Sequence, residues 1–264
     1  MSERVRYEVR AVERVAVVTL ARPEKRNALD PETVSEIDAA LAAAESDEGV
    51  RAILIAGEGK DFCAGADIAH VERTVEMSRA ELEEDAMALG RVFLRMRVLP
   101  KPIVAAVQGN ALAGGAGLAT ACDLVVASDD AHFGYPEVHI GFVPAMVLTM
   151  LVRAVGEKRA FALAALGQRI GAREALEQGI VHAVFSRHTF ADDAFALAAD
   201  LATRSTTSIA FSKRLLHELG ELTFEEGIVR GAAVNAEARV TEDCRAGLRA
   251  FLARREPPAD APQG

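Results

Sequence analysis

Hydrophobic residues recur along the chain with two different periods. Four short runs, rich in β-branched or small apolar residues and closed by polar or turn residues, are typical of buried strands. These runs are residues 15–20, 50–57, 103–107 and 124–127. Longer segments with apolar residues at every third or fourth position lie between and after them, which indicates helices.

The first predicted helix has a clear start. Asp30 is a capping acid, Pro31 stands at the first helical position, and apolar side chains follow at Val34, Ile37 and Leu41. The other predicted helices are residues 80–98, 157–166, 173–178, 190–201 and 223–238.

This order of elements predicts an α/β fold. Strands that alternate with helices favour parallel βαβ units, with helices packed outside the sheet. From about Pro144 onward strand patterns nearly vanish, so the last third of the chain is expected to be helical. There is no internal repeat, and no linker rich in Gly, Ser and Pro marks a domain boundary.

Composition narrows the classes of function. The 264 residues carry a formal net charge of −9, and aromatic residues make up only 5% of them, with no Trp. A nucleic acid would therefore meet an acidic particle with few rings for base stacking, and we expect no nucleic-acid partner. The cysteines, Cys63, Cys122 and Cys244, have no CxxC spacing, so neither a disulfide framework nor a metal site is expected.

We expect a cytoplasmic protein without a membrane partner. No apolar run approaches the roughly 18 residues that a membrane helix requires. The first ten residues are too polar for a signal peptide.

Several common catalytic motifs are absent from the sequence. It contains no GxSxG, HExxH or GxxxxGK[ST] segment. Residues 115–120 resemble a dinucleotide-binding loop only superficially, because Thr120 stands where the third glycine belongs. No Rossmann-type cofactor is expected.

Two glycine-bearing segments, residues 61–68 and 108–117, each follow a predicted strand. Small residues let a ligand approach the backbone, and N–H groups at a helix start have no intrahelical acceptor. Two such N–H groups would form an oxyanion hole. The alternative is that the glycines only permit tight turns and close packing.

A third segment, residues 133–144, places Glu137 inside an apolar loop stiffened by proline. Desolvation there would raise the pKa of its carboxyl toward values useful for proton transfer. Glu137 is therefore a candidate general acid/base, the alternative being a solvated or capping residue.

Together these segments resemble the crotonase, or enoyl-CoA hydratase/isomerase, superfamily. The resemblance extends from about Val15 to Arg255, and its segments follow one another in the expected order. They are residues 22–29 (RPEKRNAL), 62–68 (FCAGADI), 101–107 (KPIVAAV), 109–123 and 133–144. Each segment is modest alone, but jointly they are highly specific.

The resemblance implies a core of ββα turns wound into a spiral over residues 1–200, which carries a CoA-thioester site. It also implies a C-terminal helical oligomerisation region over residues 201–264, and a homo-oligomer that is a trimer or a dimer of trimers. The ligand would be an acyl-CoA thioester. Coenzyme A would be part of the substrate, with no separate cofactor.

The resemblance also assigns candidate site residues. By matching position, the backbone N–H groups of Ala66 and Gly114 would hold the thioester oxygen. Lys25 and Arg26 would lie near the nucleotide portion, and Arg254 would assist from a neighbouring subunit. The residues expected to line the same cleft are Ala28, Ala64, Asp67 and Ile68.

The chain departs from the family pattern at one catalytic position. Typical hydratases of the family hold the attacking water between two glutamates; Glu137 matches the second, whereas Gly117 stands at the position of the first. Loss of one acid/base group would cost roughly 10²–10⁴ in rate. The sequence therefore slightly favours isomerisation, which a single acid can perform, over hydration, with decarboxylation third.

A replacement acid from elsewhere in the chain remains an alternative. The candidates are Asp67, His139 and Asp123, for which a cap, a satisfied loop histidine and a structural residue at a strand start are the simpler interpretations. A second class of function is a CoA-thioester binding or assembly protein that has lost its chemistry.

Overall fold

The computed structural model describes residues 4–253, so Arg254 lies outside the described residues. The chain divides into two compact units, residues 1–203 and 204–264. The main strands of the first unit are β1 (Val5–Arg10), β2 (Val15–Leu20), β3 (Ala52–Gly57), β4 (Ile103–Val107), β6 (Leu124–Ser128) and β9 (Ala183–Phe185). They form one sheet in the order β1-β2-β3-β4-β6-β9, in which β1 and β2 are antiparallel and the later pairs are parallel. The predicted α/β class is confirmed.

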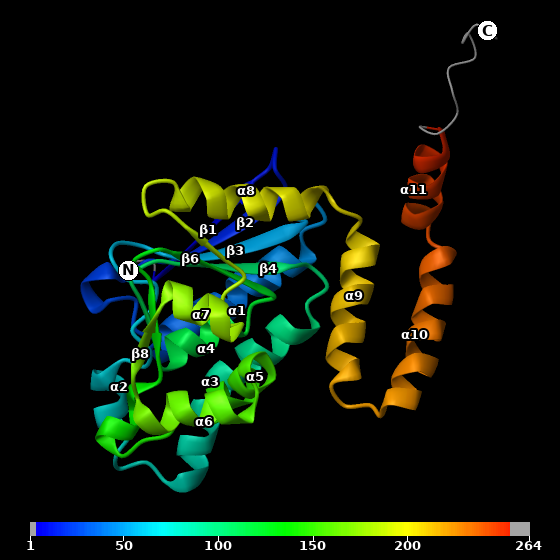
Figure 1. The fold of residues 1–264 in the computed structure, drawn as a ribbon. Coiled ribbons are helices and arrows are strands. Elements are labelled where there is room, and N and C mark those ends of the chain that lie inside the picture. Colours follow the sequence, from blue (N-terminus) through cyan, green and yellow to red (C-terminus); the bar gives the residue numbers. More distant parts are fainter. Residues whose placement is uncertain (1–3, 254–264) are drawn as a thin grey trace, which may run out of the picture. The chain divides into compact units, whose positions relative to one another are not determined.

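Both faces of this sheet are buried, because successive side chains of a strand point to opposite sides. In β3, Ile53 and Ile55 belong to one core, whereas Ala52 and Leu54 belong to the other. Figure 1 shows α8 (Phe190–Thr203) across one face and α1 (Pro31–Ser46) and α4 (Gly114–Thr120) on the other. The strands therefore read as continuous apolar runs in the sequence.

A smaller sheet contains β5 (Asn110–Leu112), β7 (His132–Gly134) and β8 (Arg169–Gly171). β4 is followed at once by β5 and then by α4. In the same way β6 is followed by β7 and then by a 3₁₀ helix, η2 (Pro136–Ile140). These are successive ββα-like turns, in which one strand joins each sheet and the helical element follows.

The remaining helical elements of the first unit are η1 (Pro23–Lys25), α2 (Ile68–Arg73), α3 (Arg79–Val98), α5 (Ala145–Val155), α6 (Glu157–Leu166) and α7 (Ala172–Gln178). The predicted start of α1 is confirmed, since the Asp30 carboxylate accepts from the Thr33 N–H at 2.9 Å. As expected, strands nearly vanish after Pro144. Two three-residue strands, β8 and β9, lie beyond that point because pairing with neighbours defines them rather than an apolar run.

The second unit is helical, as expected. Its described helices are α9 (Thr206–Leu219), α10 (Phe224–Arg239) and α11 (Glu242–Ala253). α10 begins with a capping box, in which the Thr223 hydroxyl and the Glu226 carboxylate satisfy each other's backbone N–H groups.

Asp61 ties together the loops that follow β2, β3 and β4. Its side chain is only 5% exposed; it accepts hydrogen bonds from the Arg26 Nε at 2.9 Å and the Asn110 N–H at 3.0 Å, and also from the Asn110 side-chain amide. Burial acts to raise the pKa of this carboxyl, but these hydrogen bonds and the charge of Arg26 outweigh burial, so the pKa is lowered.

Replacing Asp61 with Asn should lower the free energy of unfolding at pH 7 by about 1–3 kcal/mol, because a buried charge-assisted hydrogen bond is lost. The folded pKa of Asp61 lies below its unfolded value, so its contribution is present above the unfolded pKa and is lost as the pH falls through the folded pKa. The free energy of unfolding, measured with urea, should therefore fall less for the variant than for the wild type as the pH drops from about 5 to about 2.

The matched control is Asp192→Asn, which removes an exposed carboxylate from α8. This control should retain the acid dependence of the wild type. The same acid dependence in the Asp61→Asn variant would contradict the assigned role of Asp61.

Candidate active site

The two glycine-bearing loops run side by side after β3 and β4. The Phe62 N–H donates to the Gln108 carbonyl at 2.9 Å, and the Cys63 N–H donates to the Asn110 carbonyl at 3.0 Å. The Leu112 N–H in turn donates to the Cys63 carbonyl at 3.0 Å. Backbone pairing thus continues past the ends of both strands and fixes the register of one loop against the other.

A third segment pairs with the first loop. The Leu29 N–H donates to the Gly65 carbonyl and the Asp67 N–H donates to the Leu29 carbonyl, both at 2.8 Å. These bonds use the peptide groups on either side of Ala66. Among the described residues, the Ala66 N–H itself has no hydrogen-bond acceptor.

The Ala66 and Gly114 amides are close neighbours. Gly65 has φ +93°, and a Cβ there would lie 2.8 Å from the Leu112 carbonyl oxygen and 3.3 Å from the Gly114 nitrogen. A Cβ on Gly114 would lie 4.0 Å from the Ala66 nitrogen. Gly65 is therefore required for this close approach.

The Gly114 N–H begins α4, where no intrahelical acceptor exists for it. The preceding residue, Ala113, has φ 50° and ψ −125°, a conformation that side-chain-bearing residues seldom adopt. In the described part of the chain no acceptor is found for the Gly114 N–H either. Two neighbouring N–H groups from separate loops are thus able to donate hydrogen bonds to a ligand oxygen.

Glu137 lies on η2, and a short chain of contacts connects it to α4. β5 pairs with β7 up to Gly134, and the Ala113 N–H donates to the Gly134 carbonyl at 2.9 Å. Glu137 is 7% exposed, and its Oε2 has no hydrogen-bond partner among the described residues. Burial raises the pKa of this carboxyl, and its own backbone N–H offsets part of the shift.

The position of the expected first glutamate, Gly117, is filled by a neighbouring side chain. A Cβ at Gly117 would lie 2.5 Å from Cγ2 of Val147 on α5. Gly117 and Val147 are both buried. Nearby, the Leu29 and Leu89 side chains lie 3.7 and 3.6 Å from the Cβ position of Gly114. The surroundings of the two amides are therefore largely apolar.

Lys25 and Arg26 are exposed at the end of η1, next to the first glycine-bearing loop. The Ala64 N–H donates to the Arg26 carbonyl at 2.9 Å, which joins this turn to the loop. The Arg26 guanidinium pairs with Asp61, so Arg26 is already partly engaged, whereas no ion pair involves Lys25 among the described residues.

The four residues expected to line the cleft differ in exposure. Ala28 is buried, Ala64 is half-buried and Ile68 is 67% exposed. Asp67 is the N-cap of α2, where its carboxylate accepts from the Ala69 N–H at 3.0 Å and pairs with Arg22 at 3.0 Å. Burial acts to raise the pKa of Asp67, but the bonds from Arg22 and the backbone outweigh burial and lower it. Asp67 is thus an ionised cap rather than a free acid.

Arg22 was not predicted as a site residue, yet it holds three segments together. Its guanidinium donates to the Ala28 carbonyl at 2.6 Å and pairs with Asp30 and Asp67, each at 3.0 Å. Through Asp67 it anchors the chain directly after Ala66. No sequence pattern indicated this role, because the partners lie up to 45 residues away.

The other proposed replacement acids have structural partners. The Asp123 carboxylate accepts from the Ile103 N–H at 2.8 Å. His139 would share a face with Glu137 only in an extended segment, and η2 is instead a 3₁₀ helix, in which residues two apart point in different directions. The His139 Nε2 contacts the Gly167 carbonyl at 3.2 Å.

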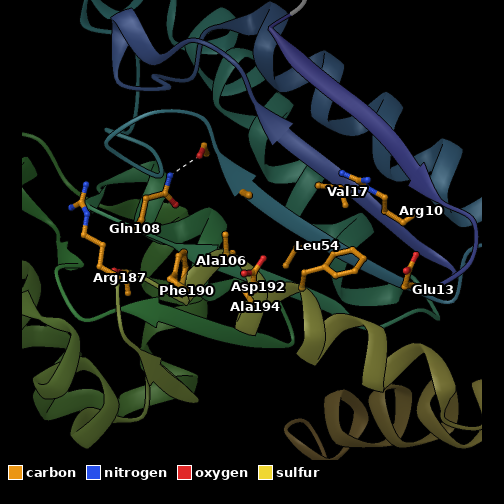
Figure 2. Close-up of a pocket in the computed structure, with 15 residues that line it drawn as sticks. Arg10, Glu13, Val17, Leu54, Ala106, Gln108, Arg187, Phe190, Asp192 and Ala194 are labelled. Atoms are coloured by element: carbon orange, nitrogen blue, oxygen red, sulfur yellow. Dashed lines mark hydrogen bonds between the residues drawn. The ribbon is translucent and has the colours of Figure 1, made fainter.

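A separate hollow of about 650 Å³ lies between α8 and the face of the sheet that α8 covers. Figure 2 shows its apolar floor, which includes Leu54 and Ala106, and Arg10 and Arg187 near its two ends. None of the predicted site residues lines this hollow. It is therefore distinct from the candidate active site.

Residues 4–253 contain neither a candidate metal centre nor a candidate membrane-spanning helix. No group of three or more His, Cys, Asp or Glu side chains is placed to hold a metal ion. No helix in this range is long and apolar enough to cross a membrane.

Comparison with known proteins identifies the family. The model of the enoyl-CoA hydratase/isomerase family matches residues 10–261. A Thermus thermophilus protein, named provisionally as an enoyl-CoA hydratase, is 46% identical over 92% of this chain and 96% of its own length. The short-chain-enoyl-CoA hydratase of Clostridium acetobutylicum is 34% identical, with coverage of 92% and 93% respectively.

Solved structures agree with this result. The crystal structure of an enoyl-CoA hydratase from Mycobacterium smegmatis superposes with a TM-score of 0.90 at 29% identity, covering 98% of this chain and all of that one. A Geobacillus kaustophilus enoyl-CoA hydratase structure gives a TM-score of 0.89 at 33% identity, covering 97% of each chain. The predicted crotonase fold is therefore confirmed, and the chain belongs to the enoyl-CoA hydratase/isomerase family of enzymes.

Proposed function

We propose that this enzyme isomerises enoyl-CoA thioesters, with Glu137 as its single acid/base and the Ala66 and Gly114 N–H groups as its oxyanion hole. The substrate would be a 3-enoyl-CoA and the product the conjugated 2-enoyl-CoA. Coenzyme A belongs to the substrate, and no separate cofactor takes part.

The two neighbouring amides support the first part of this proposal. Removal of a proton from C2 moves negative charge onto the thioester oxygen, and the enolate needs donors that are already in place. The Ala66 and Gly114 nitrogens come from loops held in register by backbone pairing, and their N–H groups have no other acceptor among the described residues. They would donate to that oxygen without prior rearrangement.

Burial of Glu137 supports the second part. Its raised pKa makes the ionised carboxylate a stronger base than an exposed one. The carboxylate takes a proton from C2, the double bond shifts from C3–C4 to C2–C3, and the same carboxyl returns the proton to C4. No atoms are gained or lost, and a second acid is not required.

The observation that carries the choice of isomerisation is the packing of Val147 against Gly117. Hydration needs a water that is oriented and deprotonated while a proton is delivered to C2. Where family hydratases have the first glutamate, this chain has an apolar side chain in contact with a glycine. At that position the chain therefore offers no acidic side chain to hold the attacking water.

Lys25 and Arg26 would bind the phosphates of coenzyme A, since both are exposed on a turn that is joined to the oxyanion loop. Ala28, Ala64, Asp67 and Ile68 would line the path between this turn and the thioester. Within that path Asp67 would act through the Arg22 pair, which keeps the loop in place.

The second unit would mediate self-association into a trimer or a dimer of trimers. Large apolar side chains of α9 and α10 are exposed, among them Leu216, Phe224, Ile228 and Val229. Exposed apolar side chains gathered on amphipathic helices are typical of subunit interfaces.

Hydration is the second candidate, because the similar proteins from Thermus thermophilus and Clostridium acetobutylicum are named as hydratases. Decarboxylation of a 3-carboxyacyl-CoA and binding without turnover are the remaining alternatives. Isomerisation, hydration and decarboxylation differ in the product that is formed, and binding without turnover forms none.

A panel of three thioesters distinguishes them. With 3-hexenoyl-CoA, crotonyl-CoA and a 3-carboxyacyl-CoA tested separately, kcat/KM for double-bond migration should exceed that for hydration by roughly 10² or more, the cost of one missing acid/base group. Chromatography and mass spectrometry of the products give the answer. Hydration as the faster reaction, or binding with no product at all, would contradict the isomerase assignment.

Replacement of Glu137 with Gln should lower kcat by about 10²–10⁴, because the amide cannot accept the C2 proton. Calorimetric binding of a saturated acyl-CoA should change little, since the amides and the basic turn are intact. A variant that keeps most of its turnover would eliminate the role of Glu137.

A double variant tests the geometry at Gly117. Gly117→Glu alone should destabilise the protein by about 1–3 kcal/mol, because the new Cβ overlaps Val147. Gly117→Glu combined with Val147→Ala relieves the overlap and should hydrate crotonyl-CoA at least roughly tenfold faster than the Val147→Ala control, as a second carboxylate becomes available. No increase over that control would show that Gly117 is not where the attacking water is activated.

A further inference from the structure

The Ala66 N–H shares its peptide group with the Gly65 carbonyl. A trans peptide group is planar, so its C=O and its N–H point in opposite directions. The Gly65 carbonyl accepts from the Leu29 N–H at 2.8 Å, and the Ala66 N–H, on the other side of the same plane, has no acceptor among the described residues. The bond from Leu29 therefore sets the direction in which the Ala66 N–H points.

The Leu29 N–H belongs in turn to a peptide group that Arg22 holds. The carbonyl of this group is that of Ala28, and it accepts from Nη1 of Arg22 at 2.6 Å. A hydrogen-bond chain thus extends from the guanidinium through the peptide group of residues 28 and 29 to that of residues 65 and 66. The Ala66 N–H is the last donor of this hydrogen-bond chain.

Most of the hydrogen-bond chain is shielded from water. Its buried residues are Ala28, Leu29 and Gly65. The Arg22 side chain is 11% exposed, whereas Ala66 is exposed at the end where a ligand would bind. Buried hydrogen bonds in series strengthen one another by about 10–30% each, and a charged donor makes a stronger bond than a neutral one. The Arg22 cation thus makes the Ala66 N–H a better donor.

Two carboxylates fix the guanidinium in this position. Asp30 and Asp67 each pair with Arg22 at 3.0 Å. Burial acts to raise the pKa of both carboxyls, but hydrogen bonds and the charge of Arg22 outweigh burial and lower it, so both are ionised at neutral pH. Because these carboxylates offset the charge of the cation, Arg22 acts on Ala66 through the hydrogen bonds rather than through a net positive charge.

The Gly114 N–H is supported in a different way. The carbonyl of its peptide group, that of Ala113, accepts from the Gly117 N–H at 3.0 Å at the start of α4. The donor here is a neutral backbone group on the same helix. A change at Arg22 should therefore weaken the Ala66 N–H as a donor and leave the Gly114 N–H unchanged.

We propose that Arg22 is a positioning residue for catalysis, which orients and strengthens the Ala66 donor of the oxyanion hole through two peptide groups in series. The inference rests on the proposed role of the Ala66 and Gly114 N–H groups, and Arg22 itself need not touch the substrate. Negative charge on the thioester oxygen grows in the transition state. A better donor there consequently raises kcat more than it tightens substrate binding.

The first test is Arg22→Gln, which removes the charged donor. The Ala66 N–H remains but is weaker, so kcat for 3-hexenoyl-CoA isomerisation should fall roughly tenfold, less than the 10²–10³ typical of a lost oxyanion donor. KM and the calorimetric Kd of a saturated acyl-CoA should stay within about twofold of the wild type. Weaker binding with an unchanged kcat would overturn the proposal.

Arg4→Gln is the matched control. Arg4 pairs with the same Asp30 carboxylate, but among the described residues it is bonded neither to the Ala28 carbonyl nor to Asp67. This variant should keep the kcat of the wild type. Equal losses in the two variants would mean that disturbing Asp30 is sufficient, and the proposal would fail.

The amide protons of the oxyanion hole give a second measurement, which needs no turnover. In protein labelled with ¹⁵N-alanine, the Ala66 signal is the one absent from Ala66→Gly; with ¹⁵N-glycine, the Gly114 signal is the one absent from Gly114→Ala. A saturated acyl-CoA should move both protons downfield in the wild type, since both donate to the thioester oxygen. In Arg22→Gln the Ala66 proton should move less, and the Gly114 proton should move as far as in the wild type.

These signals separate a failure of this inference from a failure of the proposed function. If neither proton moves in the wild type, the oxyanion hole is wrong and the role of Arg22 is refuted with it. If both move, and the Ala66 proton moves equally far in Arg22→Gln, only the role of Arg22 is refuted. Both results are independent of the reaction that the enzyme catalyses.

Arg22→Lys covers the case in which Arg22→Gln does not fold, because it keeps a cation beside Asp30 and Asp67. A single ammonium lacks the planar fork that reaches both the Ala28 carbonyl and Asp67. Its kcat and the movement of its Ala66 proton should be smaller than in the wild type and larger than in Arg22→Gln. Values equal to those of the wild type would contradict the proposal.

A backbone substitution tests the hydrogen-bond chain with every side chain in place. Replacing Leu29 with its α-hydroxy acid exchanges the Leu29 N–H for an ester oxygen, which removes the bond to the Gly65 carbonyl. kcat should fall, and adding Arg22→Gln should lower it little further, because both changes act on the same series of bonds. Losses that multiply would show that Arg22 acts by another route, and would overturn the proposal.

Discussion

The site depends on the backbone pairing that continues beyond β3 and β4. Hydrogen bonds from Phe62, Cys63 and Leu112 lock the two loops together, and Asp61 closes the same junction with its carboxylate. This pairing brings the Ala66 nitrogen and the start of α4 side by side, which side chains alone would not fix so firmly. Backbone donors also need no particular side chain, so the arrangement is compatible with many sequences.

Next to these two backbone amides, the proposed chemistry depends on the absence of an acidic side chain at position 117. Gly117 offers no side chain, Val147 fills the adjacent space, and Glu137 remains as a buried acid with a raised pKa. A proton shuttle under an enolate needs one such group, whereas water addition needs two. The apolar packing at α4 and α5 is thus the physical reason why we propose isomerisation rather than hydration for this chain.

Much of the fold could be predicted from the sequence, because buried parallel strands and the capped start of α1 have strong local patterns. The short strands β8 and β9 could not, since partners define them. The conditional role of His139 failed because the proline that stiffens the loop starts a 3₁₀ helix. Arg22 and Val147 escaped notice because their partners, Asp67 and Gly117, are distant in sequence.

The most direct test is a crystal structure of the enzyme with a bound enoyl-CoA or an enolate-like thioester analogue. The account predicts that the thioester oxygen accepts from the Ala66 and Gly114 N–H groups at about 2.7–3.1 Å. It also predicts that the Glu137 carboxylate lies within hydrogen-bond reach of C2 and C4, at about 3–3.5 Å. A thioester oxygen held by other groups, or a carboxylate directed away from the acyl chain, would contradict it.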